Sequence, residues 1–324
     1  MIVLITGAGG MIGRKLAARL AADATLAGRA ITRLVLHDVI AADVPQRATV
    51  PVSSATGDLA AAGEAAKLVA AKPDVVFHLA AIVSGEAEQD FDKGYRINMD
   101  GTRSLLEAIR RAGHKPRLVF ASSIAVFGAP FPDAISDEFF TTPLTSYGTQ
   151  KAIGELLLSD YSRRGFVDGI AIRLPTICVR PGRPNKAASG FFSNIMREPL
   201  AGEEAVLPVS ESVMHWHASP RAAVGFMLHA ALLDLARLGW RRALAMPGLA
   251  VTVGEQIAAL RKVAGDKVVA RIRRMPDPFV EGIVVGWPRK FQPTRALELG
   301  FKADTSFEEI IRIHIEDELG GKIA

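Results

Sequence analysis

A glycine-rich loop directly behind the first apolar run constrains the fold of this chain more than any other feature. The run from Ile2 to Thr6 leads into TGAGGMIG, in which Gly7, Gly10 and Gly13 are spaced three residues apart, and a helical pattern follows. In such a loop the first glycine allows a tight turn, the second lets a pyrophosphate approach the backbone, and the third lets the helix pack on the strand. The spacing is one residue longer than the common G-x-G-x-x-G. It is therefore the place of this glycine loop, between a strand and a helix, that predicts a dinucleotide site.

Short β-branched runs alternate with Ala- and Leu-rich segments over the first 125 residues. The expected strands are Ile2 to Thr6, Arg33 to His37, Val75 to Leu79 and Leu118 to Ser122, and the expected helices are Met11 to Ala22, Leu59 to Ala71 and Gly101 to Ala112. The strands lack polar alternation, as expected when helices cover both faces of a parallel sheet. A further buried strand, Gly169 to Leu174, ends at Pro175, which cannot continue a central strand. The pattern predicts an α/β fold with a doubly wound parallel sheet.

The strand and helix rhythm weakens after residue 174. The segment from Val179 to Pro208 is rich in proline and glycine and indicates a loop with one short helix, Phe191 to Met196, of the kind that shapes a substrate pocket. We expect a dinucleotide-binding domain over residues 1–174 and a mainly substrate-binding domain over residues 175–324. No linker separates the two, so we expect the second domain to be interleaved with the first.

Composition narrows the class of protein. The chain has 324 residues, of which 49% are hydrophobic and 23% charged, and this balance excludes a disordered chain. The net charge is only +5, without a long basic run, which argues against a nucleic-acid partner and permits an anionic small substrate. The single cysteine, Cys178, is expected to be a buried thiol and fits a reducing compartment. The sequence shows neither a signal peptide nor an apolar stretch of about 20 residues, so we expect a cytoplasmic protein without membrane contact.

Two carboxylates follow predicted strands. Asp38 ends the second strand, where it would accept both ribose hydroxyls of an adenosine and repel a 2'-phosphate, and this favours NAD over NADP. Asp58 precedes a predicted helix, in which Leu59 is the first residue. Asp58 can therefore bind the adenine amino group, cap the helix, or do both.

Three residues form a candidate acid-base group. Ser123 lies at the end of a predicted strand, and Tyr147 and Lys151 are four residues apart in a helical pattern, which places them on one face. Free tyrosine has a pKa of about 10. A neighbouring ammonium and a positive nicotinamide ring both favour the phenolate. Tyr147 can then remove the proton of an alcohol while Ser123 holds its oxygen and Lys151 also binds the nicotinamide ribose.

Four motifs together resemble the extended short-chain dehydrogenase/reductases, the NAD-dependent epimerase/dehydratase family. They are TGAGGMIG, HLAA at His78 to Ala81, SSIAVFG at Ser122 to Gly128 and YGTQK at Tyr147 to Lys151, and LGFKADTSFEEII resembles the C-terminal segment of the same family. The resemblance implies a homodimer through helices that include the one with Tyr147, and Ser123, Tyr147 and Lys151 as catalytic residues. It implies that NAD is lined by Gly7, Gly10, Met11, Ile12, Gly13, Asp38, Asp58, Leu59, Leu79, Ala80, Ala81, Asn98, Tyr147, Lys151 and Pro175.

Departures from the family pattern bear on the substrate. Sugar-nucleotide epimerases of the family usually carry an Asn where this chain has RLPTICVRPG, and a Tyr where it has Phe127. The segment from Arg173 to Ser193 resembles instead a branch of the family that oxidises the C2 hydroxyl of the four-carbon sugar acid D-erythronate. A nucleotide-sugar epimerase or dehydratase, and a dehydrogenase of other uronates or aldonates, are the alternatives.

A sugar acid needs a cation to hold its carboxylate. Arg180 and Arg183 follow the last predicted strand, and a planar guanidinium suits a carboxylate. Ser84 and Thr176 are candidates for the substrate hydroxyls, as are Ser123 and Tyr147 for the reacting one. His215 and His217 lack a third ligand at suitable spacing, so we expect packing roles for them and no metal site.

Overall fold

A computed structural model of the protein describes residues 1–182 and 189–324. Internal contacts divide the described chain into two compact units. The first comprises Met1–Val126, Thr145–Arg173 and Val224–Leu244, and the second comprises Phe127–Leu144, Leu174–Ala223 and Ala245–Ala324. The assignment of residues 1–174 to the cofactor and 175–324 to the substrate stays a prediction.

A seven-stranded sheet with the order β13-β9-β7-β6-β1-β4-β5 organises the first unit. Its strands are β1 (Ile2–Thr6), β4 (Arg33–Asp38), β5 (Val52–Thr56), β6 (Val75–His78), β7 (Arg117–Ser123), β9 (Asp168–Leu174) and β13 (Ala243–Ala245). Between β1 and β4 along the chain, β2 (Thr25–Leu26) and β3 (Arg29–Ala30) form a separate hairpin. The pairs β1 with β4, β1 with β6, β4 with β5 and β6 with β7 are all parallel. The order reverses between β1 and β6, so the doubly wound fold expected from the sequence is confirmed and its ligand crevice is expected there.

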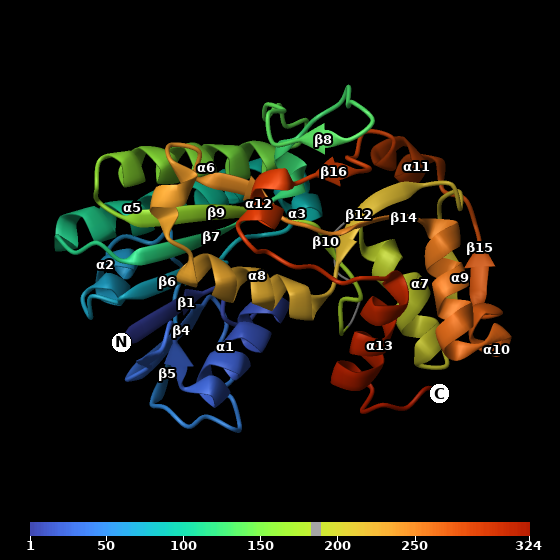
Figure 1. The fold of residues 1–324 in the computed structure, drawn as a ribbon, viewed down its shortest axis with the longest axis horizontal. Helices are drawn as coiled ribbons and strands as arrows, with labels where there is room; N and C mark the ends of the chain where they lie inside the picture. Colours follow the sequence, from blue (N-terminus) through green and yellow to red (C-terminus); the bar gives the residue numbers. More distant parts are fainter. Residues whose placement is uncertain (183–188) are drawn as a thin grey trace. The chain divides into compact units, whose positions relative to one another are not determined.

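Helices cover both faces of this sheet. Figure 1 shows α5 and α6 on one face, where α6 packs on β7, and α1 on the other face, where it packs on β1 and β4. The helices of this part are α1 (Met11–Asp23), α2 (Glu64–Val69), α3 (Ser84–Gln89), α4 (Phe91–Gly94), the π-helix η1 (Tyr95–Asp100), α5 (Gly101–Ala112), η2 (Ile124–Val126), α6 (Ser146–Arg163), α8 (Pro220–Leu232) and η3 (Leu235–Leu238). Buried Leu, Ile, Val and Phe side chains fill the layer between α5, α6 and the sheet.

Two predicted helices have different bounds in the structure. The helix expected over Leu59 to Ala71 spans only Glu64–Val69, because Gly63 adopts φ of +83° and Ala61 donates to the carbonyl of Asp58, which makes the first residues a turn. The helix expected over Phe191 to Met196 is longer and runs from Gly190 to Leu200.

The second unit combines short strands with helices around its own apolar core. Its strands are β8 (Ile135–Ser136), β10 (Thr176–Ile177), β11 (Ala205–Leu207), β12 (Met214–Ala218), β14 (Leu249–Thr252), β15 (Ile272–Arg274) and β16 (Phe291–Gln292), and its helices are α7 (Gly190–Leu200), α9 (Val253–Ala264), α10 (Asp266–Val269), α11 (Pro278–Val284), α12 (Thr294–Glu298) and α13 (Phe307–Glu318). The strand β12 pairs with β10 in parallel and with β14 in antiparallel.

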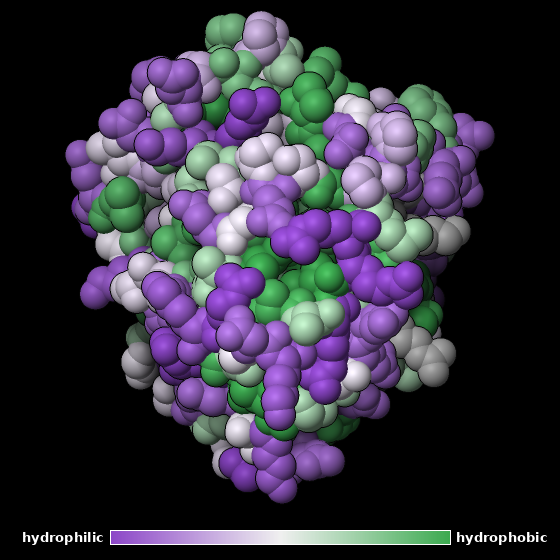
Figure 2. Space-filling view, turned by 90° about the vertical axis from the view of Figure 1, so that its right-hand side faces the viewer, coloured by the Kyte–Doolittle hydropathy of each residue, from purple (hydrophilic) through white to green (hydrophobic). Residues whose placement is uncertain are grey.

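Hydrophilic residues dominate the face in Figure 2, with smaller groups of hydrophobic residues between them. Among the helices in the described ranges, none has the length and apolar character that a membrane crossing requires.

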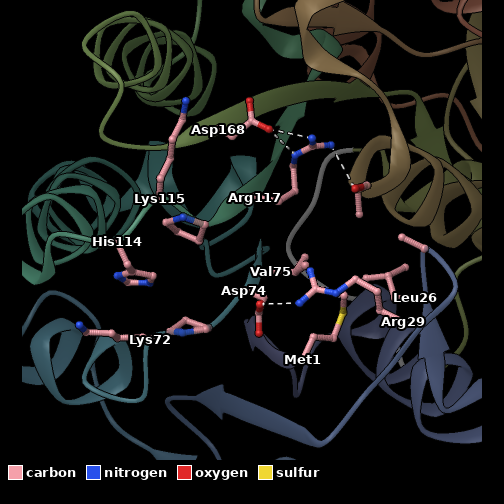
Figure 3. Close-up of a pocket in the computed structure, with 14 residues that line it drawn as sticks. Met1, Leu26, Arg29, Lys72, Asp74, Val75, His114, Lys115, Arg117 and Asp168 are labelled. Atoms are coloured by element: carbon pink, nitrogen blue, oxygen red, sulfur yellow. Dashed lines mark hydrogen bonds and ion pairs between the residues drawn. The ribbon is translucent and has the colours of Figure 1, made fainter.

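The amino ends of the central strands border an open cavity of about 460 Å³ (Figure 3). At its wall, the Arg117 guanidinium pairs with Asp168, with Nη2 2.7 Å from Oδ2, and its Nη1 donates to the carbonyls of Ala231 at 3.0 Å and Leu233 at 2.7 Å. Arg29 pairs with Asp74 at 2.9 Å in the same cavity. Arg117 thus joins β7, β9 and the carboxyl end of α8, where a positive charge is favourable.

Candidate active site

The glycine loop contacts the chain just behind β6, at the point where the strand order reverses. Gly7 has φ of +76°, and a Cβ there would lie 2.5 Å from the nitrogen of Ala80 and 2.6 Å from the carbonyl carbon of Leu79. A Cβ on Gly13 would lie 2.2 Å from the carbonyl oxygen of Gly7. Only glycine fits at both positions, and the loop is held against the carboxyl ends of β1 and β6.

The amino end of α1 is suited to an anion. Gly10 is the N-cap, no side chain caps this end, and the first turn, which contains Met11 and Ile12, has no acidic residue. A Cβ on Gly10 would meet only the Gly7 carbonyl oxygen, at 3.3 Å, within a 4 Å radius of the described atoms. The loop is therefore open on that side, and the backbone N–H groups of the first turn and the helix dipole favour a phosphate group there.

Asp38 connects the second strand of the sheet to this loop. It is the last residue of β4, and its Oδ2 accepts from the backbone N–H of Gly9 at 2.9 Å while Oδ1 accepts from Val39 at 2.7 Å. The backbone fixes the carboxylate beside the glycine loop, which is the position from which it would contact an adenosine ribose.

Asp58 has an ion-pair partner that sequence reasoning missed. One oxygen accepts from the N–H of Ala60 at 2.9 Å, and the other pairs with Arg96 on η1. Burial raises the pKa of Asp58, but the hydrogen bonds and charge of Arg96 outweigh burial and hold it below 3.8. The expectation that Asp58 caps the helix is wrong, because α2 begins only at Glu64 with Gly63 as its N-cap, and Asp58 holds the turn before it instead. Adenine contact stays a prediction. Leu59 next to it is buried.

Asn98 lies in the π-helix and joins two other elements. Its Oδ1 accepts from the N–H of Ile82 at 2.8 Å, directly behind Ala81, and its Nδ2 donates to Gln150 on α6 at 2.7 Å. Both side chains are buried. Asn98 therefore fixes the chain behind β6 and the helix of Tyr147 with one amide. π-helical turns are often found at functional sites.

Lys151 is buried where α6 crosses β7. A Cβ on Gly154 would lie 2.7 Å from the ring of Phe120, so glycine lets α6 approach the strand closely. Lys151 is 3% exposed, and its Nζ donates to the carbonyl of Ala121 at 2.8 Å. Burial lowers the pKa of Lys151 to about 8, while Glu155 opposes this effect. Lys151 is therefore mostly an ammonium at neutral pH, although its pKa lies only about one pH unit above neutrality.

Tyr147 lies near this lysine, and Ser123 ends the strand whose Ala121 carbonyl accepts from it. Tyr147 is in the first turn of α6, whose N-cap Thr145 accepts from Gly148 at 3.0 Å, and the Lys151 Nζ is 5.7 Å from the centre of its ring. Ser123 is the last residue of β7, and its Oγ accepts from the N–H of Ala125 at 3.1 Å. The structure therefore supports the predicted helical arrangement of Tyr147 and Lys151 beside the strand that ends at Ser123.

Glu155 and Arg173 were not identified from the sequence. Glu155 lies one turn behind Lys151 and is buried; it accepts from Ser122 Oγ at 2.5 Å and from Arg173 Nη2 at 2.7 Å. A carboxylate four residues behind a lysine in a helix was the available signal. Its negative charge favours the ammonium of Lys151.

The other predicted substrate residues occupy different positions. Ser84 is the first residue of α3 in the first unit. In the second unit Thr176 opens β10 behind Pro175, and its Oγ1 lies 2.7 Å from His215 Nε2. Arg180 donates from Nε to the carbonyl of Ile177 at 3.0 Å and from Nη2 to Ser189 at 2.9 Å. Arg183 lies outside the described residues.

The remaining polar core residues of the second unit pack as expected. Cys178 is a buried thiol, as predicted, and burial raises its pKa to about 12. His215 and His217 are buried against Phe192, with ring centroids 5.2 Å and 4.7 Å apart. In the described ranges no three His, Cys, Asp or Glu side chains gather in a way that could hold a metal ion.

Comparison with known proteins places the chain in a family. Residues 3–217 match the model of the NAD dependent epimerase/dehydratase family. The chain is 50% identical over 321 residues to the D-erythronate dehydrogenase of Cupriavidus necator, covering 98% of each, and 44% identical to that of Haemophilus influenzae, covering 98% of this chain and 100% of the relative. A crystal structure described as the nucleoside-diphosphate-sugar epimerase from Agrobacterium tumefaciens is 64% identical, with a TM-score of 0.97, covering 100% of this chain and 96% of that one. The chain belongs to the NAD-dependent epimerase/dehydratase family.

Proposed function

We propose that the protein is an NAD-dependent dehydrogenase that oxidises the C2 hydroxyl of D-erythronate to give 2-dehydro-D-erythronate. The observation that carries the chemistry is the buried Lys151 ammonium beside the ring of Tyr147, at the strand that ends in Ser123. The full-length similarity to two proteins named D-erythronate dehydrogenase supports the choice of substrate.

The residues of this chain handle the proton of the alcohol. Tyr147 is the general base that takes the hydroxyl proton, and the Lys151 ammonium favours the phenolate that this requires. Ser123 donates a hydrogen bond to the same oxygen and holds it as it becomes a carbonyl. NAD, when bound, supplies the acceptor for the hydride that leaves C2.

The cofactor would be held by the loop and the strand ends already described. The uncapped start of α1 binds the pyrophosphate, Asp38 binds the adenosine ribose and selects NAD, and Asp58 lies on the adenine side. Lys151 binds the nicotinamide ribose, and Pro175 lies on the nicotinamide side. The other contacts are Met11, Ile12, Leu59, Leu79, Ala80, Ala81 and Asn98.

A cation must hold the substrate carboxylate so that C2 is the carbon that reacts. We assign this role to Arg180, with Arg183 as the alternative. Ser84 and Thr176 contact the remaining hydroxyls. The Arg180→Lys variant tests the assignment, since a point charge does not replace a bidentate guanidinium. We expect catalytic efficiency on D-erythronate to fall roughly 10 to 150-fold, the cost of about 1.5 to 3 kcal/mol for one charge-assisted hydrogen bond.

We also propose that the protein is a cytoplasmic homodimer without a nucleic-acid or membrane partner. The modest net charge argues against a nucleic-acid partner, and the single cysteine, a free thiol, fits the reducing cytoplasm. On α6, Leu156 is 71% exposed, which fits a helix that packs on its copy. Light scattering of the Leu156→Glu variant tests the interface, and a dimer of unchanged strength would contradict it.

A nucleotide-sugar epimerase is the second candidate, because the 64% identical structure carries that description. An epimerase would use the same three residues but regenerate NAD in every cycle, with no net NADH. The deciding experiment follows NADH absorbance with NAD and a panel of aldonates, uronates and UDP-sugars. We expect NADH with D-erythronate, and interconversion of UDP-hexoses without NADH would overturn the proposal.

A further inference from the structure

A chain of two hydrogen bonds ends at Thr176. The Thr176 Oγ1 lies 2.7 Å from His215 Nε2, and the His215 Nδ1 lies 2.8 Å from the carbonyl oxygen of Pro288. His215 is the second residue of β12. His217, two residues further along the same strand, lies opposite Thr176 in the register of β10 and β12. All three members of the chain belong to the second unit.

The Pro288 carbonyl fixes the tautomer of His215. A carbonyl oxygen can only accept a hydrogen bond, so Nδ1 must carry the hydrogen. In a neutral imidazole the other nitrogen, Nε2, then has only a lone pair to offer. The Thr176 hydroxyl must therefore donate its single hydrogen to Nε2.

The surroundings of His215 keep the ring neutral. It is 3% exposed and stacks on Phe192 with an angle of 2° between the rings, and Trp287 lies 5.3 Å away. Burial lowers the pKa of His215 to about 4, and the charge of Arg180 acts in the same direction. The direction of the Thr176 hydrogen bond is thus fixed at neutral pH.

Thr176 has only acceptor capacity left for any further partner. Thr176 as a residue is partly exposed, whereas His215 and His217 behind it are buried. Of this group, Thr176 is therefore the residue that a small molecule can reach. A carboxylate is also only an acceptor, so the two oxygens would repel each other, whereas a hydroxyl group can donate.

Building on the proposed function, we propose that His215 is a positioning residue that makes Thr176 a specificity residue for a substrate hydroxyl beyond C2. Thr176 accepts a hydrogen bond from the C3 or C4 hydroxyl of the sugar acid and disfavours a carboxylate at that place. The proton of the C2 hydroxyl goes to Tyr147, so C3 and C4 carry the donors that remain. The substrate is thereby oriented with its carboxylate away from Thr176.

The first experiment compares substrates with wild-type enzyme. D-erythronate is measured against its 3-deoxy and 4-deoxy analogues and against meso-tartrate, in which a carboxylate replaces the C4 hydroxymethyl group. One deoxy analogue should lose about tenfold in kcat/KM, mainly through KM, because it leaves the acceptor without a donor. Meso-tartrate should lose at least as much.

The second experiment changes Thr176. In Thr176→Val, kcat/KM for D-erythronate should fall to the value that the wild type shows with the affected deoxy analogue. On that analogue the variant and the wild type should have equal kcat/KM. Thr176→Ser keeps the hydroxyl and should retain the discrimination. This pair separates loss of the hydrogen bond from a general disturbance of β10.

The third experiment changes His215. His215→Phe keeps an aromatic ring against Phe192 but removes the acceptor, so the Thr176 hydroxyl is free to donate as well. The ratio of kcat/KM between D-erythronate and meso-tartrate should narrow by about tenfold. If this variant does not fold, the Thr176 variants and the substrate series still decide the matter.

The outcomes separate this inference from the proposed function. Oxidation of D-erythronate and both deoxy analogues with equal kcat/KM would overturn the inference and leave the proposed function intact. The inference would also be overturned if Thr176→Val and wild type showed the same ratio of kcat/KM between D-erythronate and the deoxy analogues. Absence of NADH with D-erythronate would overturn the proposed function, and the inference with it.

Discussion

The two edges of the central sheet use charge in different ways. At the amino edge, Arg117 and Arg29 are neutralised by Asp168 and Asp74 within the chain (Figure 3). At the carboxyl edge, the buried Lys151 ammonium is held by the Ala121 carbonyl and faces two aromatic rings, and among the described residues it has no ion-pair partner. These two arginines at the amino edge are therefore paired with carboxylates, whereas the carboxyl edge keeps a costly buried charge near Tyr147, the proposed general base.

This contrast teaches where to expect function in a sheet of this kind. Both edges carry arginines and lysines, so composition alone does not distinguish them. The distinguishing features are an uncapped helix start, glycines without room for a Cβ, and a buried ammonium whose pKa is lowered by burial. Substitutions at the carboxyl edge should therefore change activity, and substitutions at the amino edge should change stability.

The largest expected effect comes from Tyr147→Phe, which removes the ionisable oxygen and keeps the ring. We expect kcat on D-erythronate to fall by roughly 10²-fold or more, the usual scale of general acid-base catalysis. The control is Tyr161→Phe, the same chemical change on the same helix, whose hydroxyl bonds to Glu107. Steady-state NADH assays should show nearly unchanged kcat for the control. Similar rates for both variants would remove Tyr147 from the mechanism.

At the amino edge, Arg117→Met should destabilise the fold and spare the chemistry. The Arg117 side chain is 19% exposed, so loss of its pair leaves Asp168 partly buried without its main partner. We expect a loss of about 2 kcal/mol in the free energy of unfolding, or roughly 30-fold in the folding equilibrium, less than for a fully buried pair. Urea unfolding measures this effect.

The matched control for Arg117 is Arg111→Met. Arg111 also pairs with a carboxylate, Glu107, but its side chain is 76% exposed, so the change should cost less than about 0.5 kcal/mol. Below the unfolding transition, Arg117→Met should keep the kcat of the wild type. A large drop in kcat of the folded variant would contradict the expectation that substitutions at the amino edge change stability and leave activity intact.

Cofactor preference tests Asp38 at the carboxyl edge. We expect NAD to be preferred over NADP by at least tenfold in kcat/KM, or about 1.4 kcal/mol. Asp38→Asn removes the charge but can still accept from Gly9, so the preference should narrow while the loop stays in place. Asp43→Asn, an exposed change in the following segment, is the control. Equal use of both cofactors by the wild type would remove the assigned role of Asp38.

The smallest effect concerns pH and Lys151. Burial lowers the pKa of Lys151 from 10.5 to about 8, so between these values the unfolded chain binds more protons than the folded chain. The contribution of Lys151 to stability must then rise with pH across this window, by at most about tenfold in the folding equilibrium per pH unit. Below about pH 8 both states are protonated, and the contribution is constant and unfavourable.

Unfolding of wild type and Lys151→Met at several pH values between 7.5 and 10 checks this sign. The difference in unfolding free energy, wild type minus variant, should increase with pH. Lys72→Met at the amino edge, where the side chain is exposed, serves as control. A difference that decreases with pH would show that Lys151 is charged and favourably paired in the fold.

The sequence predicted the central strands well because helices cover both faces of the sheet, which makes each strand a continuous apolar run. The strand β13 was missed, since three residues, Ala243–Ala245, carry no distinguishable pattern. The helix α2 was overextended because Leu59 and its neighbours are helix formers, while a left-handed Gly63 decides where the helix begins. Local conformation, not composition, set that boundary.

The candidate site was predictable where its residues are close in sequence and less so where they meet only in the fold. Gly7 to Gly13 and Tyr147 to Lys151 are local motifs, so their arrangement follows from helix and turn geometry. Arg96 meets Asp58 across 38 positions, and Arg173 meets Glu155 across two elements. Such pairs depend on the register of the strands, which the sequence does not display. The hydrogen-bond direction at Thr176 depends in turn on a carbonyl 112 positions away, that of Pro288.

The return of residues 224–244 to the first unit has a consequence for the order of biosynthesis. The strand β13 closes the edge beside β9, where Ala171 donates to the carbonyl of Arg242 at 2.8 Å, and Arg117 holds the carboxyl end of α8. A ribosome that has synthesised only the first 174 residues has supplied the glycine loop and the helix with Tyr147 and Lys151, but it leaves β9 as an open edge that can pair with other chains. The nascent chain cannot complete its seven-stranded sheet until about three quarters of the polypeptide has emerged.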